Sequence, residues 1–305
     1  LFQSNASLQI GVERAAKAAR TAKGAEYGSP VWLGRRQEDT ARLAEGGAGA
    51  DGGADKVLSM LVRHGEAWAA TSGGAVRRIN LETGETIELL RGHTAPISSL
   101  CLYEVSPSRL LVVTGSWDKS ICFWAVRDGR SPAAARPRPV MVLRDAAGDF
   151  IKAVHGVPSS NVLLSGGSDR IVRAWDMLAL AQWASAMSDD EWNGNALDTP
   201  RADVPKPQLL AVLREHTRPI TCLATLPGEP GQAEAVRTLF SSDSMGRTLE
   251  LSLEVSRPSE GKATAAFRVE RELRGSETGV YDVRPGWRAE EQQDGSTRWA
   301  AEVWT

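Results

Sequence analysis

The feature that most constrains this fold is a short motif that occurs twice with the same spacing. A run of Leu, Val, Thr, Gly and Ser leads into Asp118, and Trp124 follows six residues later. A run of Leu, Ser and Gly leads into Asp169, and Trp175 again follows six residues later. Both segments are short, rich in β-branched or aromatic residues and bounded by turn-forming residues, which is typical of β-strands. The shared offset indicates copies of one repeated unit.

The segments that enter these strands also recur. His93 precedes Ile97 by four residues, and His216 precedes Ile220 by the same four residues. A third copy therefore begins near His216. Self-similarity of this kind along the chain predicts an architecture built by stacking one supersecondary unit.

The remaining copies are weaker. In the third copy we align Gly246 with the turn aspartate and Ser252 with the tryptophan. An earlier copy begins at Val57, and a fifth begins near residue 275, with residues 280–283 as its first strand and residues 299–305 inside its second.

These residues resemble the WD-repeat family over residues 55–305. The resemblance implies an all-β propeller in which each repeat forms a four-stranded blade around a central channel. Four to five blades are recognisable, and we expect them to belong to a seven-bladed ring. We expect the last blade to be truncated and the natural protein to continue past Thr305.

Residues 1–54 have a different composition. Residues 12–25 are rich in Ala, Lys and Arg and favour a helix, whereas residues 45–55 are rich in Gly and Ala and favour a linker. We interpret residues 1–54 as a separate N-terminal helical and low-complexity segment. The helix either docks on the propeller or is disordered, and residues 31–33 are alternatively a remnant strand of an earlier blade.

The resemblance also implies structural roles for polar residues. In the family, a histidine before the blade, a strand hydroxyl, the turn aspartate and the third-strand tryptophan form a hydrogen-bonded chain. In the copy that begins with His93 the hydroxyl is Thr114 or Ser116, and in the next copy Ala147 or Gly148 replaces the histidine. The implied set, none of it catalytic, is His93, Ser116, Asp118, Trp124, Asp169, Trp175 and His216.

Long insertions separate several of the strands. The longest, residues 178–207, contains Ser188 followed by an acidic cluster. We expect a solvated flexible loop there, with phosphorylation of Ser188 by an acid-directed kinase as the alternative. The other long loops are expected to open on this same face, which leaves the opposite face compact.

Residues beside the turns of the compact face are our candidates for binding a partner. The residue just before each turn aspartate projects from that face, and Trp and Arg are common interface anchors. For Trp117 the alternative is packing against the neighbouring blade. The candidates are Trp117, Ser168, Arg170, Arg218 and Met245.

Composition and motifs give no support to other classes of function. A net charge of −2 gives no reason to expect a nucleic-acid or membrane surface. Three scattered cysteines argue against a disulfide framework and a zinc site, and they favour the cytoplasm or nucleus. No nucleotide-binding loop, nucleophile elbow or HExxH motif is present, so we expect no cofactor, metal or enzymatic activity.

We therefore expect a non-enzymatic scaffold or adaptor that binds other proteins or peptide segments as a subunit of a complex. One alternative is the substrate receptor of a ubiquitin ligase, which needs an adaptor-binding segment. The other is a propeller enzyme with its site at the mouth of the channel, which needs carboxylates or histidines that converge on the axis.

Overall fold

The computed structural model describes residues 55–106, 109–126, 138–193, 203–227, 238–258, 262–274, 279–291 and 297–304. Within these ranges the chain forms four antiparallel sheets of four strands each and one two-stranded hairpin. We call the four sheets blades 1 to 4 in chain order. Residues 1–54 lie outside the described residues, so the division of the chain at residue 54 stays a prediction.

Each blade pairs its four strands in chain order. Blade 1 contains β1 (Val57–Arg63), β2 (Glu66–Thr71), β3 (Ala75–Asn80) and β4 (Thr86–Arg91), and blade 2 contains β5 (Ile97–Ser106), β6 (Arg109–Ser116), β7 (Ile121–Ala125) and β8 (Met141–Leu143). Blade 3 contains β9 (Ile151–Val157), β10 (Val162–Gly167), β11 (Val172–Asp176) and β12 (Gln208–Leu213), with a short 3-10 helix, η1 (Pro158–Ser160). Blade 4 contains β13 (Ile220–Thr225), β14 (Thr238–Asp243), β15 (Arg247–Ser256) and β16 (Thr264–Arg274). The predicted four-stranded repeat unit is confirmed.

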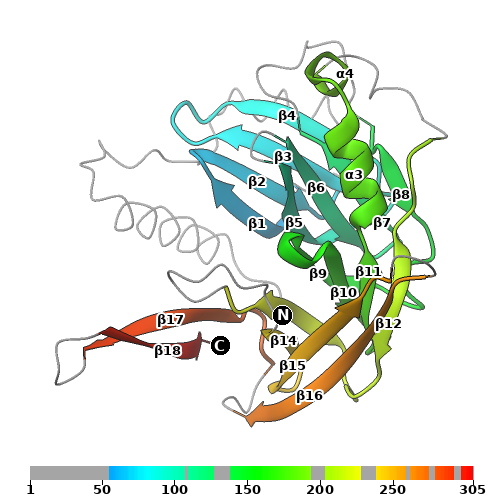
Figure 1. Ribbon diagram of the computed structural model, residues 1–305. Coiled ribbons are helices and arrows are strands. Elements are labelled where there is room, and N and C mark those ends of the chain that lie inside the picture. The colour runs from blue at the N-terminus through cyan, green and yellow to red at the C-terminus, as the bar shows by residue number, and fades with distance from the viewer. Residues whose placement is uncertain are drawn as a thin grey trace.

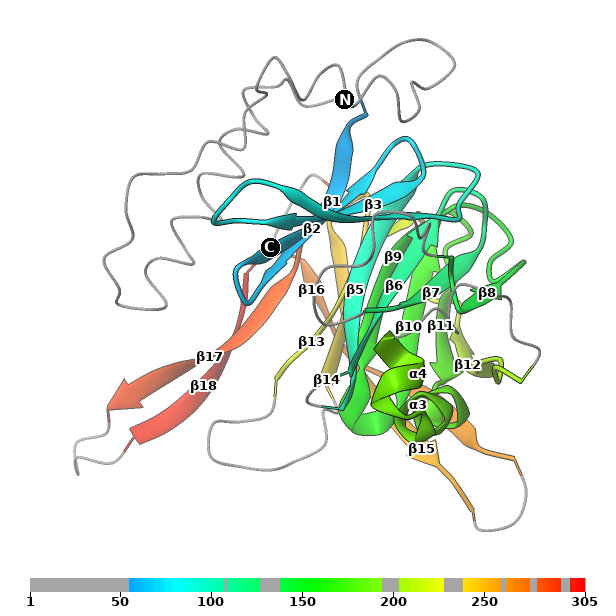
Figure 2. The ribbon, with the colours of Figure 1, turned by 90° about the horizontal axis from the view of Figure 1, so that it is seen from above.

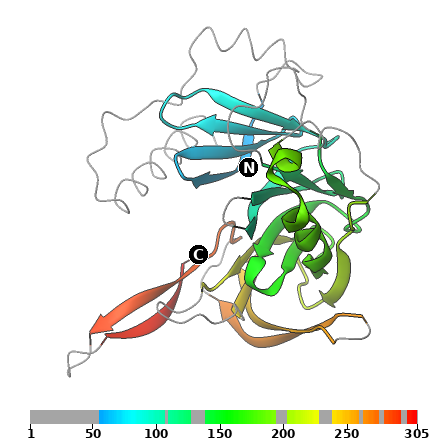
Figure 3. The same cartoon turned by 45° about the horizontal axis from the view of Figure 1, so that its top comes forward.

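The blades follow one another around an arc (Figure 1). The first strands lie side by side in the order β1, β5, β9, β13. Blade 1 stands at one end of the arc and blade 4 at the other, and the C-terminal hairpin projects away from blade 4 (Figure 3). This radial arrangement gives every interior blade a neighbour on both faces.

Blades 2 and 3, and likewise blades 3 and 4, pack closely where an isoleucine of one meets a glycine of the other. Ile151 and Ile220 begin the first strands of blades 3 and 4 and are fully buried. A Cβ atom on Gly115 of β6 would lie 2.6 Å from Ile151 Cγ2, and one on Gly166 of β10 would lie 2.8 Å from Ile220 Cγ2. Each isoleucine therefore occupies the space that a side chain on the preceding blade would need.

Hydroxyl groups add polar links between blades. The hydroxyl of Ser98, on β5, donates to the carbonyl oxygen of Ile151 in the next blade. The hydroxyl of Thr221, on β13, donates in the same way to the carbonyl oxygen of Val280, which lies in the segment after blade 4. The equivalent residue of β9, one place after Ile151, is Lys152.

The expected first strand at residues 280–283 is wrong. The C-terminal hairpin consists instead of β17 (Arg284–Glu291) and β18 (Thr297–Trp304). Val280 and Val283 are buried in a cluster with Ala224 and Phe240 of blade 4. Their apolar pattern therefore reflects packing against blade 4 rather than strand pairing.

The expectation of a flexible loop at residues 178–193 is also wrong. Two helices, α3 (Leu178–Ala186) and α4 (Asp189–Asn193), form there and join the core between blades 2 and 3 (Figure 2). The buried guanidinium of Arg109 donates to the carbonyl oxygen of Ala184 at 2.7 Å and to Asp189 Oδ1 at 2.8 Å. Trp192 is buried and donates from Nε1 to the carbonyl oxygen of Val126. Leu- and Ala-rich composition favours a helix, and an apolar face fixes it in place.

Candidate functional site

The turns between the second and third strands share one backbone geometry. Lys119 in blade 2 and Arg170 in blade 3 have positive φ angles and donate their N–H groups to the carbonyl oxygens of Ser116 and Gly167. Gly246 in blade 4 has a positive φ and donates in the same way to Asp243. The three residues are therefore structurally equivalent, and each lies one place after the turn-aspartate position.

This equivalence corrects our alignment of blade 4. Met245, not Gly246, occupies the place of Asp118, so Met245 is not the residue before the turn aspartate. By strand register, Leu251, not Ser252, lies where blade 2 has Trp124. Leu251 is 1% exposed and fills that place in the core. The sequence alignment was displaced by one residue because the aspartate that would have fixed it is absent from the turn.

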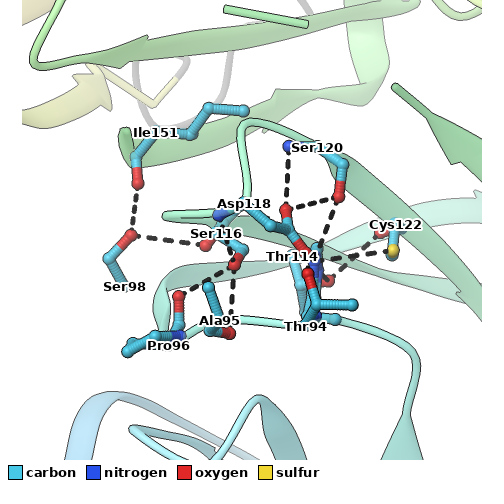
Figure 4. A network of polar contacts seen from close by, with 12 residues as sticks. Thr94, Ala95, Pro96, Ser98, Thr114, Ser116, Asp118, Ser120, Cys122 and Ile151 are labelled. Atoms are coloured by element: carbon cyan, nitrogen blue, oxygen red, sulfur yellow. Dashed lines mark hydrogen bonds and ion pairs between the residues drawn. The ribbon is translucent and has the colours of Figure 1, made fainter. Parts of the chain in front are cut away.

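Blade 2 contains a complete polar network around one histidine, and Figure 4 shows the part of it that includes Thr114, Asp118 and Ser120. His93 Nδ1 lies 2.8 Å from Asp118 Oδ2, and His93 Nε2 lies 2.8 Å from Thr114 Oγ1. Trp124 Nε1 donates to the same hydroxyl at 3.2 Å. Burial works to raise the pKa of Asp118, but hydrogen bonds from His93 and Ser120 outweigh it and hold the pKa well below its usual range. The network holds a carboxylate charged inside the turn.

Ser116 is not the hydroxyl of this network. Its Oγ donates to the carbonyl oxygens of Ala95 and Pro96, at 3.1 and 2.9 Å. Ser116 ends β6 level with the loop that enters β5, so its hydroxyl meets backbone groups, while Thr114 lies level with the imidazole. Thr114 therefore has the position that we assigned to Ser116.

Blade 3 builds a different network around Asp169. The N–H of Gly148 donates to Asp169 Oδ2 at 3.0 Å, as the N–H of Thr94 does to Asp118, so Ala147 stands where blade 2 has its histidine. Arg173, on β11, compensates with an ion pair to Asp169 Oδ2 at 2.7 Å. Trp175 Nε1 donates to Ser165 Oγ at 2.9 Å, as Trp124 does to its hydroxyl in blade 2.

Blade 4 has a histidine as blade 2 does, but the carboxylate that contacts it comes from a different position in the chain. His216 Nδ1 lies 3.2 Å from Asp243 Oδ2, and Nε2 lies 2.7 Å from Ser241 Oγ. By register, Asp243 occupies the place of Ser116, two residues before the turn-aspartate position. Burial lowers the pKa of His216, and Asp243 opposes this. We missed Asp243 in the sequence, where the available signal was an aspartate two residues upstream of an empty turn position.

An aromatic pair joins blades 2 and 3 on the compact face. We define the compact face as the turns at residues 72–74, 117–120, 168–171 and 244–246, together with the loops that enter the blades at residues 92–96, 144–150 and 214–219. Trp117 stacks on Phe150 with ring centroids 5.3 Å apart and planes 16° apart. Phe150 is 42% exposed and Trp117 is half-buried. Trp117 thus packs against the neighbouring blade and still contributes to the surface.

The other binding candidates also lie on the compact face. Ser168 is half-buried, while Arg170 and Arg218 are exposed. Met245 is 59% exposed. The N–H of Ser244 donates to the carbonyl oxygen of Pro219, which brings the turn with Met245 next to the loop with Arg218. The binding role of all five residues stays a prediction.

In the described part of the chain, the remaining partly buried histidine is already hydrogen-bonded. His155 Nε2 lies 2.9 Å from Thr225 Oγ1, and burial lowers its pKa to about 4. Within the described ranges, no group of three or more His, Cys, Asp or Glu side chains is placed to hold a metal ion. None of the helices in the described part of the chain is long and apolar enough to cross a membrane.

Comparisons with known proteins agree with this geometry. The family model "WD domain, G-beta repeat" matches residues 84–125 and 137–176. Each match runs from the fourth strand of one blade through three strands of the next. A ribosome biogenesis protein WDR12 homolog from Arabidopsis thaliana is 31% identical over 93 residues, which is 30% of this chain and 18% of that protein.

Among solved structures, a chain in the crystal structure of a mitotic checkpoint complex aligns with 80% of this chain at a TM-score of 0.48 and 14% identity. The alignment spans 60% of that chain, so this sequence covers only part of either relative's length. The two matched repeats coincide with the two blades whose turns carry the aspartate and whose third strands carry the tryptophan. Residues 84–125 and 137–176 of this chain are therefore similar to WD repeats, and the described residues form an all-β fold of propeller type.

Proposed function

We propose that this chain is a non-enzymatic scaffold that binds other proteins or peptide segments on its compact face. The observation that carries the proposal is the stacked pair of Trp117 and Phe150, which is anchored in two blades and remains partly exposed. Large rings held rigidly at a surface are typical anchors of protein interfaces. Packing of the pair across two blades removes the entropy cost of ordering it on binding.

The polar side chains beneath this face support a structural role rather than catalysis. Both ring nitrogens of His93 and of His216 lie within hydrogen-bonding distance of partners inside their own blades. The carboxylates of Asp118 and Asp169 are likewise bonded inside their turns. A general acid or base needs a proton site within reach of a substrate, and these groups are committed elsewhere.

The cytoplasm or the nucleus is the compartment that we propose. Cys101, Cys122 and Cys222 are free thiols. Burial raises the pKa of Cys101 and Cys122 to about 12, which keeps them protonated and unreactive. The Arabidopsis relative is named as a ribosome biogenesis protein, so the nucleus is the first compartment to examine with a fluorescently tagged chain.

Affinity purification from cells tests the scaffold proposal. The tagged chain is compared with a Trp117→Ala/Arg218→Ala variant and with Arg268→Gln, which removes a cation of β16 that lies outside the compact face. The proposal expects bound proteins to be lost from the first variant and kept by the second, with equal thermal unfolding confirming that both are folded. Retention of every partner by the first variant would remove the compact face as the binding site.

A further inference from the structure

Two turns of the compact face hold a long cationic side chain in a backbone conformation that favours glycine. Lys119 has a φ of 68° and Arg170 a φ of 66°. The same place in blades 1 and 4 is occupied by Gly74 and Gly246, with φ of 74° and 87°. The left-handed conformation is more strained for a residue with a Cβ atom than for glycine. Blades 2 and 3 thus keep a cation where glycine would be less strained.

The acidic residues of these turns do not neutralise the two cations. Lys119 and Arg170 are exposed, whereas Asp118 and Asp169 are held beneath them by the polar networks of their blades. Asp149 is half-buried and accepts the N–H of Phe150. On the described loops that enter blades 3 and 4, the exposed cations are Arg144, Arg214 and Arg218 and the exposed acids are Asp145 and Glu215.

The same two turns also hold the aromatic pair. Trp117 belongs to the turn of Lys119, two residues before it. Phe150 is fixed to the turn of Arg170, because its carbonyl oxygen accepts the N–H of Ser168 at 2.9 Å. A partly exposed apolar surface therefore shares its two turns with one exposed cation from each blade.

We propose that the surface formed by Trp117, Phe150, Lys119 and Arg170 recognises an acidic peptide segment that carries one bulky apolar side chain. The apolar side chain packs on the two rings, and carboxylates on either side of it pair with the two cations. This inference rests on the proposed function and narrows the partner class of the same face. A single-stranded nucleic acid also offers anions and stacking groups, and the competition experiment below distinguishes it from an acidic peptide.

Selection from a random-peptide display library tests the proposal on the full chain. Peptides that also bind the variant Lys119→Gly/Arg170→Gly are removed during selection. This variant has glycine at the turn position, as blades 1 and 4 do, and it relieves the strain of the left-handed conformation. We expect this variant to unfold at the same or a higher temperature than the wild type. A loss of binding by this variant is therefore separable from a loss of folding. Arg268→Gln serves as the matched control, because it removes a cation from a side chain that is 78% exposed on β16.

The expected result is a set of peptides enriched in Asp and Glu around one Leu, Ile, Phe or Trp. Their affinity falls about ten-fold or more for the double glycine variant, falls with added salt, and is unchanged for Arg268→Gln. Trp117→Ala weakens the same peptides without removing their salt dependence. Fluorescence anisotropy with the selected peptides measures all four quantities.

The acidic-partner inference is overturned if selection yields no peptide that depends on Lys119 and Arg170, if the dependent peptides show no acidic enrichment, or if single-stranded RNA displaces them at lower concentration than an acidic competitor peptide. The scaffold proposal survives each of these results as long as cellular partners still depend on Trp117 and Arg218. If neither peptides nor cellular partners depend on the compact face, both proposals fail.

Discussion

Blades 2 and 4 reach the same arrangement around a histidine from different sequences. In both, one ring nitrogen faces a carboxylate and the other faces a hydroxyl of the second strand. The carboxylate comes from the turn in blade 2, as Asp118, and from the end of the strand in blade 4, as Asp243. Asp118 Oδ2 and Asp243 Oδ2 thus reach the same ring nitrogen, Nδ1, from positions that differ by two residues along the chain.

The comparison teaches that a blade requires a partner for its histidine rather than an aspartate at one position. Blade 3 extends the point, since Arg173 partners its turn aspartate where the histidine is missing. The two carboxylates differ in exposure, however, because the side chain of Asp118 is 13% exposed and that of Asp243 is 1% exposed. This difference decides how costly each is to remove.

The largest effect is expected from removing the more deeply buried carboxylate. Asp243→Ala leaves His216 Nδ1 and the N–H groups of Met245 and Arg247 without their acceptor. We expect it to lower the free energy of unfolding by about 3 kcal/mol, and Asp118→Ala by about 2 kcal/mol, because water reaches Asp118 more easily. Urea unfolding followed by tryptophan fluorescence measures both. Equal losses would show that exposure does not separate the two networks.

The second prediction separates the two hydroxyls of blade 2. Thr114→Val removes the partner of both His93 Nε2 and Trp124 Nε1 while keeping the shape of the side chain. We expect Thr114→Val to lower the free energy of unfolding by about 2 kcal/mol. We expect Ser116→Ala to lower it by about 1 kcal/mol, because water can more easily replace the serine hydroxyl at the backbone carbonyl groups that it contacts. The same unfolding measurement applies. A larger loss for Ser116→Ala would return Ser116 to the centre of the network.

The third prediction transfers the residue order of the blade 2 turn to the turn of blade 4. Asp243→Ser/Met245→Asp gives blade 4 the Ser-x-Asp order of residues 116–118. If the position of the carboxylate is interchangeable, the double variant is more stable than Asp243→Ser alone by about 1 kcal/mol. Met245→Asp in the wild-type background is the control, and we expect no gain from it because His216 already has its partner. Absence of any recovery in the double variant would contradict interchangeability.

The smallest expected change in the free energy of unfolding is its pH dependence near neutral pH, which arises from the buried imidazoles. The pKa values of His155 and His216 are lowered in the folded chain by burial, from an ordinary value of 6.5. The unfolded chain therefore binds protons first as the pH falls below about 7, so both histidines contribute stability that is present at higher pH and lost on acidification. The loss between pH 7 and 6.5 is below about 0.5 kcal/mol for each histidine.

Asp118 acts in a lower range of pH. Its pKa is lowered by its hydrogen bonds, so its contribution is present above the ordinary value of 3.8 and is lost only as the pH falls below that value. Free energies of unfolding measured from pH 7 to pH 5 for the wild type and for His155→Gln test the contribution of His155, because this range lies above the one in which Asp118 acts. The variant is expected to lose less stability than the wild type, and parallel curves would contradict the role of His155.

The sequence predicted the architecture well because the strand pattern and the fixed Asp-to-Trp offset report directly on the repeated unit. It did not predict the exact partners of the networks. Thr114 and Ser116 have the same chemistry on one strand, and only their level relative to His93 distinguishes them. The alignment near Met245 failed because the left-handed residue that marks the turn is visible only in the backbone angles.

The two regions outside the repeats were predicted least well. The apolar residues Val280 and Val283 satisfied a strand pattern, but their burial depends on contact with blade 4, which no local pattern encodes. The helix Leu178–Ala186 had a recognisable composition, yet its ordering depends on the distant Arg109. Phe150 was overlooked as a surface residue for the same reason, since its role depends on a ring in another blade.

The hydroxyl links from Ser98 and Thr221 have a consequence for how such a chain tolerates mutational drift. Both links end on main-chain oxygens, which every residue type provides. The residue that accepts such a link, Ile151 in blade 3 or Val280 after blade 4, can therefore be replaced by another residue type without removing the acceptor atom. The link thus does not depend on how closely the accepting segment resembles the consensus repeat.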